Sequence, residues 1–215
     1  MPSASSRSRP RLVLATLNPA KGRELVDLLG DVPFDIQLLA DVPGARLPEE
    51  TGATYAENAL VKARTAAALT DALALGDDSG IEVDALDGAP GLYSARFGGP
   101  GLDDRGRLEL LLERLRGVPM ARRAARFRCV IALAGPARAE QVVEGVAEGL
   151  IAEAPRGQGG FGYDPVFFYP PLGRTFGELS DEDKAAVSHR GLALQAVRRL
   201  LAEKDSSRRA GAVDQ

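Results

Sequence analysis

Residues 72–80 read Ala-Leu-Ala-Leu-Gly-Asp-Asp-Ser-Gly, so a short apolar run leads directly into two adjacent carboxylates. The apolar half is typical of a buried strand. Because an unpaired buried charge costs several kcal/mol, Asp77 and Asp78 must face a turn, a cation or a substrate. Ser79 and Gly80 follow at once, and we expect the strand to stop there and a glycine-rich turn to begin. The stretch predicts a strand end that carries polar chemistry, with Asp77 supporting the turn.

Strands and helices alternate around this stretch. An apolar run at residues 11–15, with Asn18 as the N-cap and Pro19 at the first helical position, predicts a strand, a short loop and a helix. Residues 54–69 begin with the Thr-x-x-Glu pattern of a capping box and predict an alanine-rich helix. The first third of the chain therefore predicts strand and helix units that pack on a sheet.

The second half adds a hairpin and further helices. Apolar residues recur over 125–134 and 141–150, which predicts two antiparallel strands. Asp103 can cap one helix, and a cap at Ser180 predicts another that runs as one element toward Glu203. Because strands and helices are mixed along the chain, we expect an α/β fold with a mixed central sheet.

Composition limits the classes of protein that the chain can belong to. With 215 residues, 45% apolar and 27% charged, it can bury a proper core. We expect one domain over residues 10–204, between disordered tails at 1–9 and 205–215. The net charge of −3 argues against nucleic acid as a partner, and no stretch approaches the ~18 apolar residues that cross a membrane. Cys129 is the single cysteine, so we expect a buried thiol, no intramolecular disulfide and a cytoplasmic location.

A phosphate site is indicated by residues 16–21, Thr-Leu-Asn-Pro-Ala-Lys, which lead into a helix N-terminus. Unpaired backbone N–H groups and the positive end of the helix dipole favour an anion there, and Lys21 adds a full charge. A capped helix with an exposed lysine is the simpler alternative. The loop lacks the long glycine-rich segment of a P-loop, which excludes that motif.

Carboxylates in two separate segments could hold a metal ion. The pair at residues 77–78 and the glutamates at 49–50 offer the hard oxygen ligands that Mg²⁺ prefers alongside water and substrate phosphates. For residues 49–50, charges on a solvated loop are the alternative interpretation.

The glycine-rich residues 157–162 match the pattern G-x-G-x-x-G. They do not form a dinucleotide fingerprint, because Asp164 and the proline after it extend the chain where a fingerprint would open a helix. The glycines suit a close approach of backbone to a flat ligand, with Phe161 or Tyr163 available to stack on a base. A surface turn over an aromatic core is the alternative.

The only histidine lies in the run Ser188-His189-Arg190. Ser188 is four residues after Lys184, so the two share a face of the predicted helix. The cluster offers several hydrogen-bond donors and two positive charges to a ligand. A lone histidine is more often structural than catalytic, and no second histidine or reactive cysteine supports a catalytic triad.

Six ordered motifs, across nearly the whole chain, resemble the Ham1/RdgB-type inosine triphosphate pyrophosphatases, the dITP/XTP pyrophosphatase family that cleanses the nucleotide pool. The motifs are residues 16–21, 50–52 with 57–59, 76–80, 90–91 with 93–96, 159–165 and 188–190. The resemblance implies an elongated central mixed β-sheet flanked by helices, with two lobes around a nucleotide-binding cleft. It also implies a homodimer.

The same resemblance gives roles to individual residues. Asp78 matches the proton acceptor, and Asp78 with Glu50 matches the carboxylates that bind Mg²⁺. Leu17 stands where many members carry glycine, which stiffens the loop and leaves its backbone contacts possible. Lys62 and Arg96 match basic positions near the triphosphate. The expected substrate-binding residues are Thr16, Leu17, Asn18, Pro19, Ala20, Lys21, Ser79, Phe161, Gly162, Tyr163, Asp164, Lys184, His189 and Arg190.

The reaction implied by the resemblance is Mg²⁺-dependent hydrolysis of non-canonical purine nucleoside triphosphates, namely dITP, ITP and XTP, to the monophosphate and pyrophosphate. A donor aimed at the 6-oxo group would reject adenine, because the 6-amino group would leave that donor unpaired. Two alternatives stay open: a metal-dependent phosphatase that acts on another phosphorylated metabolite, and a nucleotide-binding module without turnover.

Overall fold

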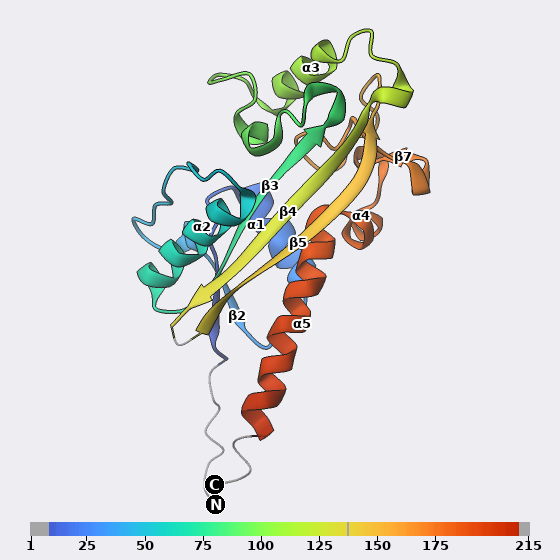
Figure 1. The fold of residues 1–215 in the computed structure, drawn as a ribbon. Helices are drawn as coiled ribbons and strands as arrows, with labels where there is room; N and C mark the ends of the chain where they lie inside the picture. The colour runs from blue at the N-terminus through green and yellow to red at the C-terminus, as the bar shows by residue number, and fades with distance from the viewer. Residues whose placement is uncertain (1–8, 137, 211–215) are drawn as a thin grey trace, which may run out of the picture.

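The computed structural model describes residues 9–136 and 138–210, and within them seven strands form one sheet in the order β2-β1-β3-β4-β5-β6-β7. β1 is parallel to β2 and β3, whereas the other neighbours are antiparallel. The long hairpin of β4 and β5 gives the molecule its elongated shape (Figure 1). The strands are β1 Arg11–Leu14, β2 Asp35–Leu38, β3 Leu73–Val83, β4 Ala124–Gly135, β5 Arg138–Ile151, β6 Phe167–Tyr169 and β7 Arg174–Thr175. The α-helices are α1 Pro19–Leu29, α2 Tyr55–Thr70, α3 Asp104–Arg114, α4 Asp181–Val187 and α5 His189–Ala210.

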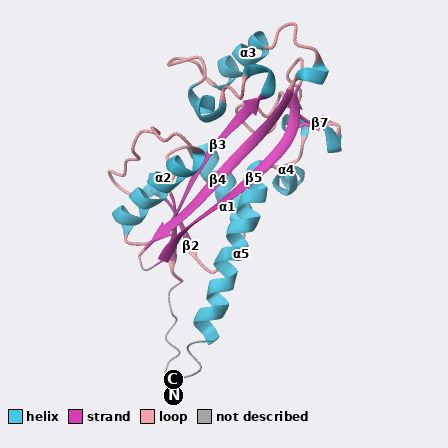
Figure 2. Ribbon diagram, viewed as in Figure 1, coloured by secondary structure: helices cyan, strands magenta, loops and turns pink. Residues whose placement is uncertain are grey.

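Helices cover both faces of the sheet, and this layering confirms the predicted α/β class (Figure 2). On one face, Ala59 and Ala63 of α2 pack against Val130 and Ala132 of β4. The opposite face carries α1 and α5, and here the sheet contributes Cys129, whose side chain is fully buried as predicted. Successive side chains of a strand point to opposite faces, so neighbouring residues of β3 and β4 meet different helices.

A further apolar cluster lies beside α3, where β3 ends and β4 begins. Phe127 of β4 and Phe167 of β6 lie with their ring centroids 4.6 Å apart, and Phe176 packs against both.

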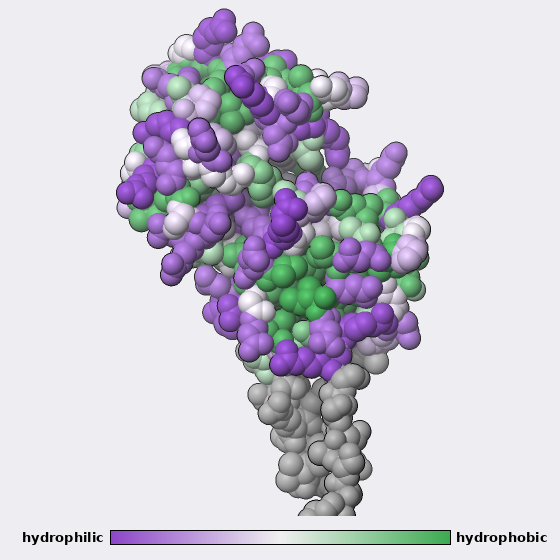
Figure 3. Space-filling model, turned by 180° about the vertical axis from the view of Figure 1, so that it is seen from behind, coloured by the Kyte–Doolittle hydropathy of each residue, from purple (hydrophilic) through white to green (hydrophobic). Residues whose placement is uncertain are grey.

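No described helix is long and apolar enough to span a membrane. Seen from behind, the surface has an apolar area on its lower half and hydrophilic residues over most of the rest (Figure 3).

The turn predicted at residues 76–80 is wrong. β3 runs without a break from Leu73 to Val83 and pairs with β4 along that length. A Cβ atom at Gly76 would collide with the backbone of α2, and one at Gly80 would collide with the carbonyl of Gly91. These glycines therefore permit close packing on the strand, and they do not turn the chain.

The single helix predicted from Ser180 to Glu203 is also wrong, because the structure divides it into α4 and α5. Ser188 is extended between them (φ −74°, ψ 153°), and its hydroxyl accepts a hydrogen bond from the N–H of Gly191. A Cβ atom at Gly191 would collide with the carbonyl of Ala185. The second helix therefore packs closely against the end of the first, and the absence of a side chain at Gly191 permits this packing.

Other predicted elements agree closely with the structure. Asn18 caps α1 with Pro19 at its first position, and the hairpin of β4 and β5 is antiparallel. Thr54 caps α2 as predicted, but Glu57 accepts a hydrogen bond from the N–H of Ala53 and not from that of Thr54. α5 continues to Ala210, so residues 205–210 of the predicted tail are helical. The predicted tail residues 1–8 and 211–215 lie outside the described residues.

Candidate active site

A cavity of about 770 Å³ lies beside β3, is lined by residues from both faces of that strand, and collects residues from all the predicted site motifs. Among the predicted site residues, Asp78, Pro19 and Ala20 do not line it. Pro19 and Ala20 form the first turn of α1, and Asp78 points to the α2 face of the sheet. The predicted residues that line the cavity are Thr16, Leu17, Asn18, Lys21, Glu50, Ser79, Phe161, Gly162, Tyr163, Asp164, Lys184, His189 and Arg190.

The loop between β1 and α1 forms one end of the cavity. The Asn18 side chain accepts hydrogen bonds from the N–H groups of Ala20 (2.9 Å) and Lys21 (3.2 Å), so these backbone donors are already engaged. The N–H of Asn18 donates to the hydroxyl of Thr16 at 3.1 Å. At this end, the groups left to meet a phosphate are mainly side chains, above all the ammonium of Lys21.

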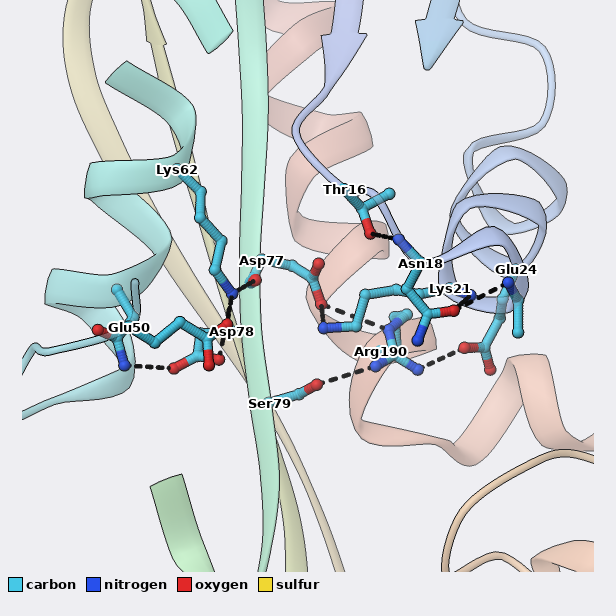
Figure 4. Close-up of polar contacts among 12 residues, drawn as sticks. Thr16, Asn18, Lys21, Glu24, Glu50, Lys62, Asp77, Asp78, Ser79 and Arg190 are labelled. Atoms are coloured by element: carbon cyan, nitrogen blue, oxygen red, sulfur yellow. Dashed lines mark hydrogen bonds and ion pairs between the residues drawn. The ribbon is translucent and has the colours of Figure 1, made fainter. Parts of the chain in front are cut away.

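Asp77 and Asp78 point to opposite faces of β3 (Figure 4). Asp77 is 2% exposed and lies on the face of α1 and α5, where its carboxylate is 3.0 Å from the Lys21 ammonium and 3.7 Å from the Arg190 guanidinium. Burial acts to raise the pKa of Asp77, but Lys21 and Arg190 outweigh it, so the pKa lies below its ordinary value. Asp77 is therefore a paired anion inside the sheet.

Asp78 lies on the α2 face, among a different set of groups. The Asn58 amide donates to its carboxylate at 2.9 Å, and the Lys62 ammonium lies 3.4 Å away. Burial raises the pKa of Asp78 above its ordinary value, although Lys62 and Asn58 act in the opposite direction. A carboxylate with a raised pKa is a better proton acceptor than an ordinary aspartate.

Glu50 brings a second carboxylate to the same lysine. The Lys62 ammonium forms an ion pair with Glu50 as well as with Asp78, and it donates to the backbone carbonyl of Asp77 at 2.9 Å. Glu50 also accepts from the Arg96 guanidinium at 3.1 Å. The loop glutamate is thus held at the sheet, and the interpretation of residue 50 as a solvated loop charge is wrong.

The convergence of Glu50 and Asp78 on one ammonium group tests whether a metal ion fits here. The two carboxylates meet at the Lys62 ammonium, with Arg96 also beside Glu50, and Mg²⁺ typically takes one or two carboxylates plus water and phosphate oxygens. No described cluster of three or more His, Cys, Asp or Glu side chains could hold a metal. The pair Glu50 and Asp78 would fit a Mg²⁺ ion if water and substrate phosphates supplied its other ligands.

The other end of the cavity has an aromatic ring beside two cations. The ring centroid of Phe161 is 5.2 Å from the Lys184 ammonium and 5.7 Å from the Arg190 guanidinium. Asp164 accepts from the N–H of Phe161 and from Lys184, both at 2.8 Å. Tyr163 instead donates its hydroxyl to the carbonyl of Ser94 at 2.9 Å and is buried. Phe161 lines the cavity beside two cations, whereas Tyr163 is buried and bonded to Ser94, so Phe161 is the better candidate to stack on a base.

His189 combines a structural contact with a place on the cavity wall. Its ring stacks on Phe127 with centroids 4.5 Å apart and planes 9° apart. Burial, with Arg190 and Lys184 nearby, holds the pKa of His189 well below its ordinary value, so the imidazole is neutral at neutral pH. Its Nδ1 atom is buried without a hydrogen-bond partner among the described residues. A neutral ring with an unused nitrogen can offer one hydrogen bond to a ligand.

Two residues of the site were missed by the sequence analysis. Glu24 pairs with Lys184 at 3.1 Å and with Arg190, and thereby connects α1 to the two terminal helices. It follows Lys21 by three residues, and this spacing on a helix could have indicated that both face the site. Asn58 lay within a recognised motif, but only the structure shows that its amide holds Asp78.

Comparisons with known proteins give matches over most of the chain. The model of the Ham1 family matches residues 12–200. The dITP/XTP pyrophosphatase of Desulforamulus reducens is 49% identical over 191 residues, which cover 89% of this chain and 95% of the relative. A dITP/XTP pyrophosphatase of Thermus thermophilus is 51% identical over 187 residues, covering 87% and 89%. A HAM1 protein from Coxiella burnetii has a solved structure with a TM-score of 0.81 at 42% identity, covering 90% of this chain and 99% of the other.

Proposed function

The chain belongs to the Ham1 family, and we propose that it hydrolyses the non-canonical purine nucleoside triphosphates dITP, ITP and XTP to the monophosphate and pyrophosphate. The observation that carries this proposal is one cavity with cations and a helix start at one end and Phe161 beside two cations at the other. The dITP/XTP pyrophosphatases to which the chain is similar make this reaction the expected one.

In the proposed reaction, Lys21 neutralises charge that grows on the pyrophosphate leaving group, and Thr16 and Ser79 contact phosphate oxygens. Asp78 orients the attacking water and accepts its proton, for which its raised pKa suits it. Glu50 and Asp78 would hold Mg²⁺, which supplies positive charge to the phosphate oxygens when it is bound.

The charge balance of the site supports a need for an added cation. Each cation of the network already faces a carboxylate, so a triphosphate would bring negative charge that the protein alone does not offset. The pairs are Lys21 with Asp77, Lys184 with Asp164, Arg190 with Glu24, Lys62 with Asp78, and Arg96 with Glu50. Because the pairs are complete without ligand, Mg²⁺ is the simplest source of the missing charge.

Base selection is assigned to the end of the cavity that contains Phe161. The ring stacks on the purine, while Lys184, His189 and Arg190 supply donors for the 6-oxo group of hypoxanthine or xanthine. Adenine carries an amine at that position, so a buried donor would lose its partner, and such polar mismatches can discriminate by ~10⁴.

We further propose a homodimer in the cytoplasm, which sedimentation and cell fractionation can test.

The experiment that tests the proposal is product analysis with dITP in the presence of Mg²⁺. Pyrophosphate and dIMP are the expected products, whereas release of orthophosphate would identify a phosphatase and contradict the proposal. Binding without turnover would contradict it as well. A panel of dITP, ITP, XTP, GTP and ATP, each with Mg²⁺ or with EDTA, should show turnover of the first three only with the metal.

A further inference from the structure

Asp77 connects the first turns of two helices that are far apart in the sequence. Lys21 belongs to α1 and Arg190 to α5, and the carboxylate of Asp77 lies between their charged groups at 3.0 and 3.7 Å. Figure 4 shows the three side chains on one side of β3, with Asp78 and Lys62 on the other. One carboxylate therefore joins the phosphate end of the cavity to its base end.

The two cations depend on Asp77 to different degrees. The Arg190 guanidinium has other anchors, because it also pairs with Glu24 and donates to the hydroxyl of Ser79 at 2.9 Å. For the Lys21 ammonium, the ion pair with Asp77 is the contact found in the described part of the chain. Any effect of Asp77 on the reaction is therefore expected to act mainly through Lys21.

The position of Asp77 does not suit it to bind the metal or to accept the proton. Its carboxylate points away from the face where Glu50 and Asp78 converge, and two cations already contact it. Its carboxylate lies in the cavity wall between these two cations, on the face opposite the carboxylates proposed to hold Mg²⁺. Asp77 can still affect the reaction in two ways: it can fix the position of Lys21, and it can reduce the positive charge of the cavity wall.

We propose that Asp77 is a positioning residue that fixes Lys21 at the phosphate end and offsets one positive charge there, which limits how tightly the site holds pyrophosphate. This inference rests on the proposed function. A free ammonium would bind the product more strongly in the ground state, but it would no longer be held where charge develops during cleavage. Loss of the carboxylate should therefore slow turnover and strengthen inhibition by the product.

The test is the variant Asp77→Asn, which keeps the shape of the side chain and removes its charge. We expect kcat to fall about tenfold or more, and the inhibition constant of pyrophosphate to fall about five- to tenfold, as expected for one uncompensated charge nearby. Pyrophosphate binding measured by calorimetry, with and without Mg²⁺, should show the same gain. A residue with only a structural role would lower the active fraction and leave pyrophosphate affinity unchanged.

Two further variants separate charge from geometry. Asp77→Glu keeps the charge but displaces it by one methylene, so kcat should fall while pyrophosphate affinity stays within about twofold of wild type. Asp84→Asn is the matched control, because Asp84 directly follows β3, pairs with Arg126 at 2.6 Å and does not line the cavity. It should leave both quantities unchanged. If Asp77→Asn fails to fold, the Asp77→Glu result still decides whether position matters.

A double-mutant cycle with Lys21→Met tests whether Asp77 acts through the lysine. In the Lys21→Met background, Asp77→Asn should change kcat and pyrophosphate affinity by less than twofold. Full and independent effects of both substitutions would overturn the inference, as would weaker pyrophosphate binding by Asp77→Asn alone. Wild-type protein that does not cleave dITP would contradict the proposed function, whereas calorimetry with pyrophosphate would still test the role of Asp77.

Discussion

The two faces of β3 hold adjacent aspartates in opposite electrostatic settings. On the face of α1 and α5, Asp77 is paired with two cations and its pKa is lowered. On the α2 face, burial raises the pKa of Asp78, and Lys62 is shared with Glu50. The difference shows that an extended strand separates two neighbouring carboxylates into unrelated environments. One face holds the cavity wall in place, and the other offers a proton acceptor and a place for a metal.

The strongest test of this comparison removes the charge of Asp78. Asp78→Asn should lower kcat about 10³-fold, because it removes the proposed proton acceptor and one metal ligand. Turnover is measured as pyrophosphate release from dITP, and calorimetry with dITP should still show binding, since the phosphate and base ends of the cavity are intact. Turnover above a tenth of the wild-type value would show that the α2 face does not carry the chemistry.

Removal of the Lys62 ammonium on the α2 face should have the next largest effect. Lys62→Met leaves the buried carboxylate of Asp78 without a positive partner, so the free energy of unfolding should fall by about 3 kcal/mol. Because Glu50 and Asp78 then have an open place for a cation, Mg²⁺ should raise the melting temperature more in the variant than in wild type. Arg64→Met, which removes an exposed ion pair from the same helix, serves as the control and should change stability little.

On the opposite face, His189 predicts a pH dependence of stability. Burial, Arg190 and Lys184 lower its pKa in the folded protein, so below pH ~6.5 the unfolded chain binds a proton that the folded one does not. Stability should therefore decrease as the pH falls from about 6.5 to 5, by up to ~1.4 kcal/mol per pH unit. Urea unfolding across this range should show that slope, and His189→Gln should flatten it. Parallel curves for the two proteins would refute a neutral buried histidine.

The smallest effect concerns the cap of α5, next to the same histidine. Ser188→Ala removes the hydroxyl that accepts from the N–H of Gly191 and should cost about 1 kcal/mol of stability. Chemical denaturation measures the loss. Ser180→Ala, at the exposed start of the seven-residue helix α4, should cost less. An equal or larger loss at Ser180 would mean that α5 does not depend on this cap to keep Arg190 near Asp77.

Local signals predicted much of the fold, because their causes lie within a few residues. The cap at Asn18 and the hairpin of β4 and β5 follow from nearby residues and hold in the structure. The path of β3 could not be found in this way. Its charged centre is tolerated because Lys21, Lys62 and Arg190 reach it from three distant segments. The sequence of the strand itself does not indicate these distant partners.

The sequence predicted which residues form the site but not how they are arranged in space. The motifs identified the residues that meet in the cavity, yet the partition of Asp77 and Asp78 between two faces required the strand geometry. The break between α4 and α5 was hidden because helical spacing continues across Ser188. The close approach of Gly191 to the carbonyl of Ala185, where a Cβ atom would collide, is visible only in the structure.

The single thiol of Cys129 offers a built-in reporter for this part of the sheet. It is fully buried directly across from Ser79 in the register of β3 and β4, and burial raises its pKa to about 12. Alkylation of this thiol requires that α1 and α5 move away from the sheet, because in the folded protein they bury its sulfur. The rate of labelling therefore measures how often the helices uncover the face of the sheet on which Asp77 lies, without any engineered probe.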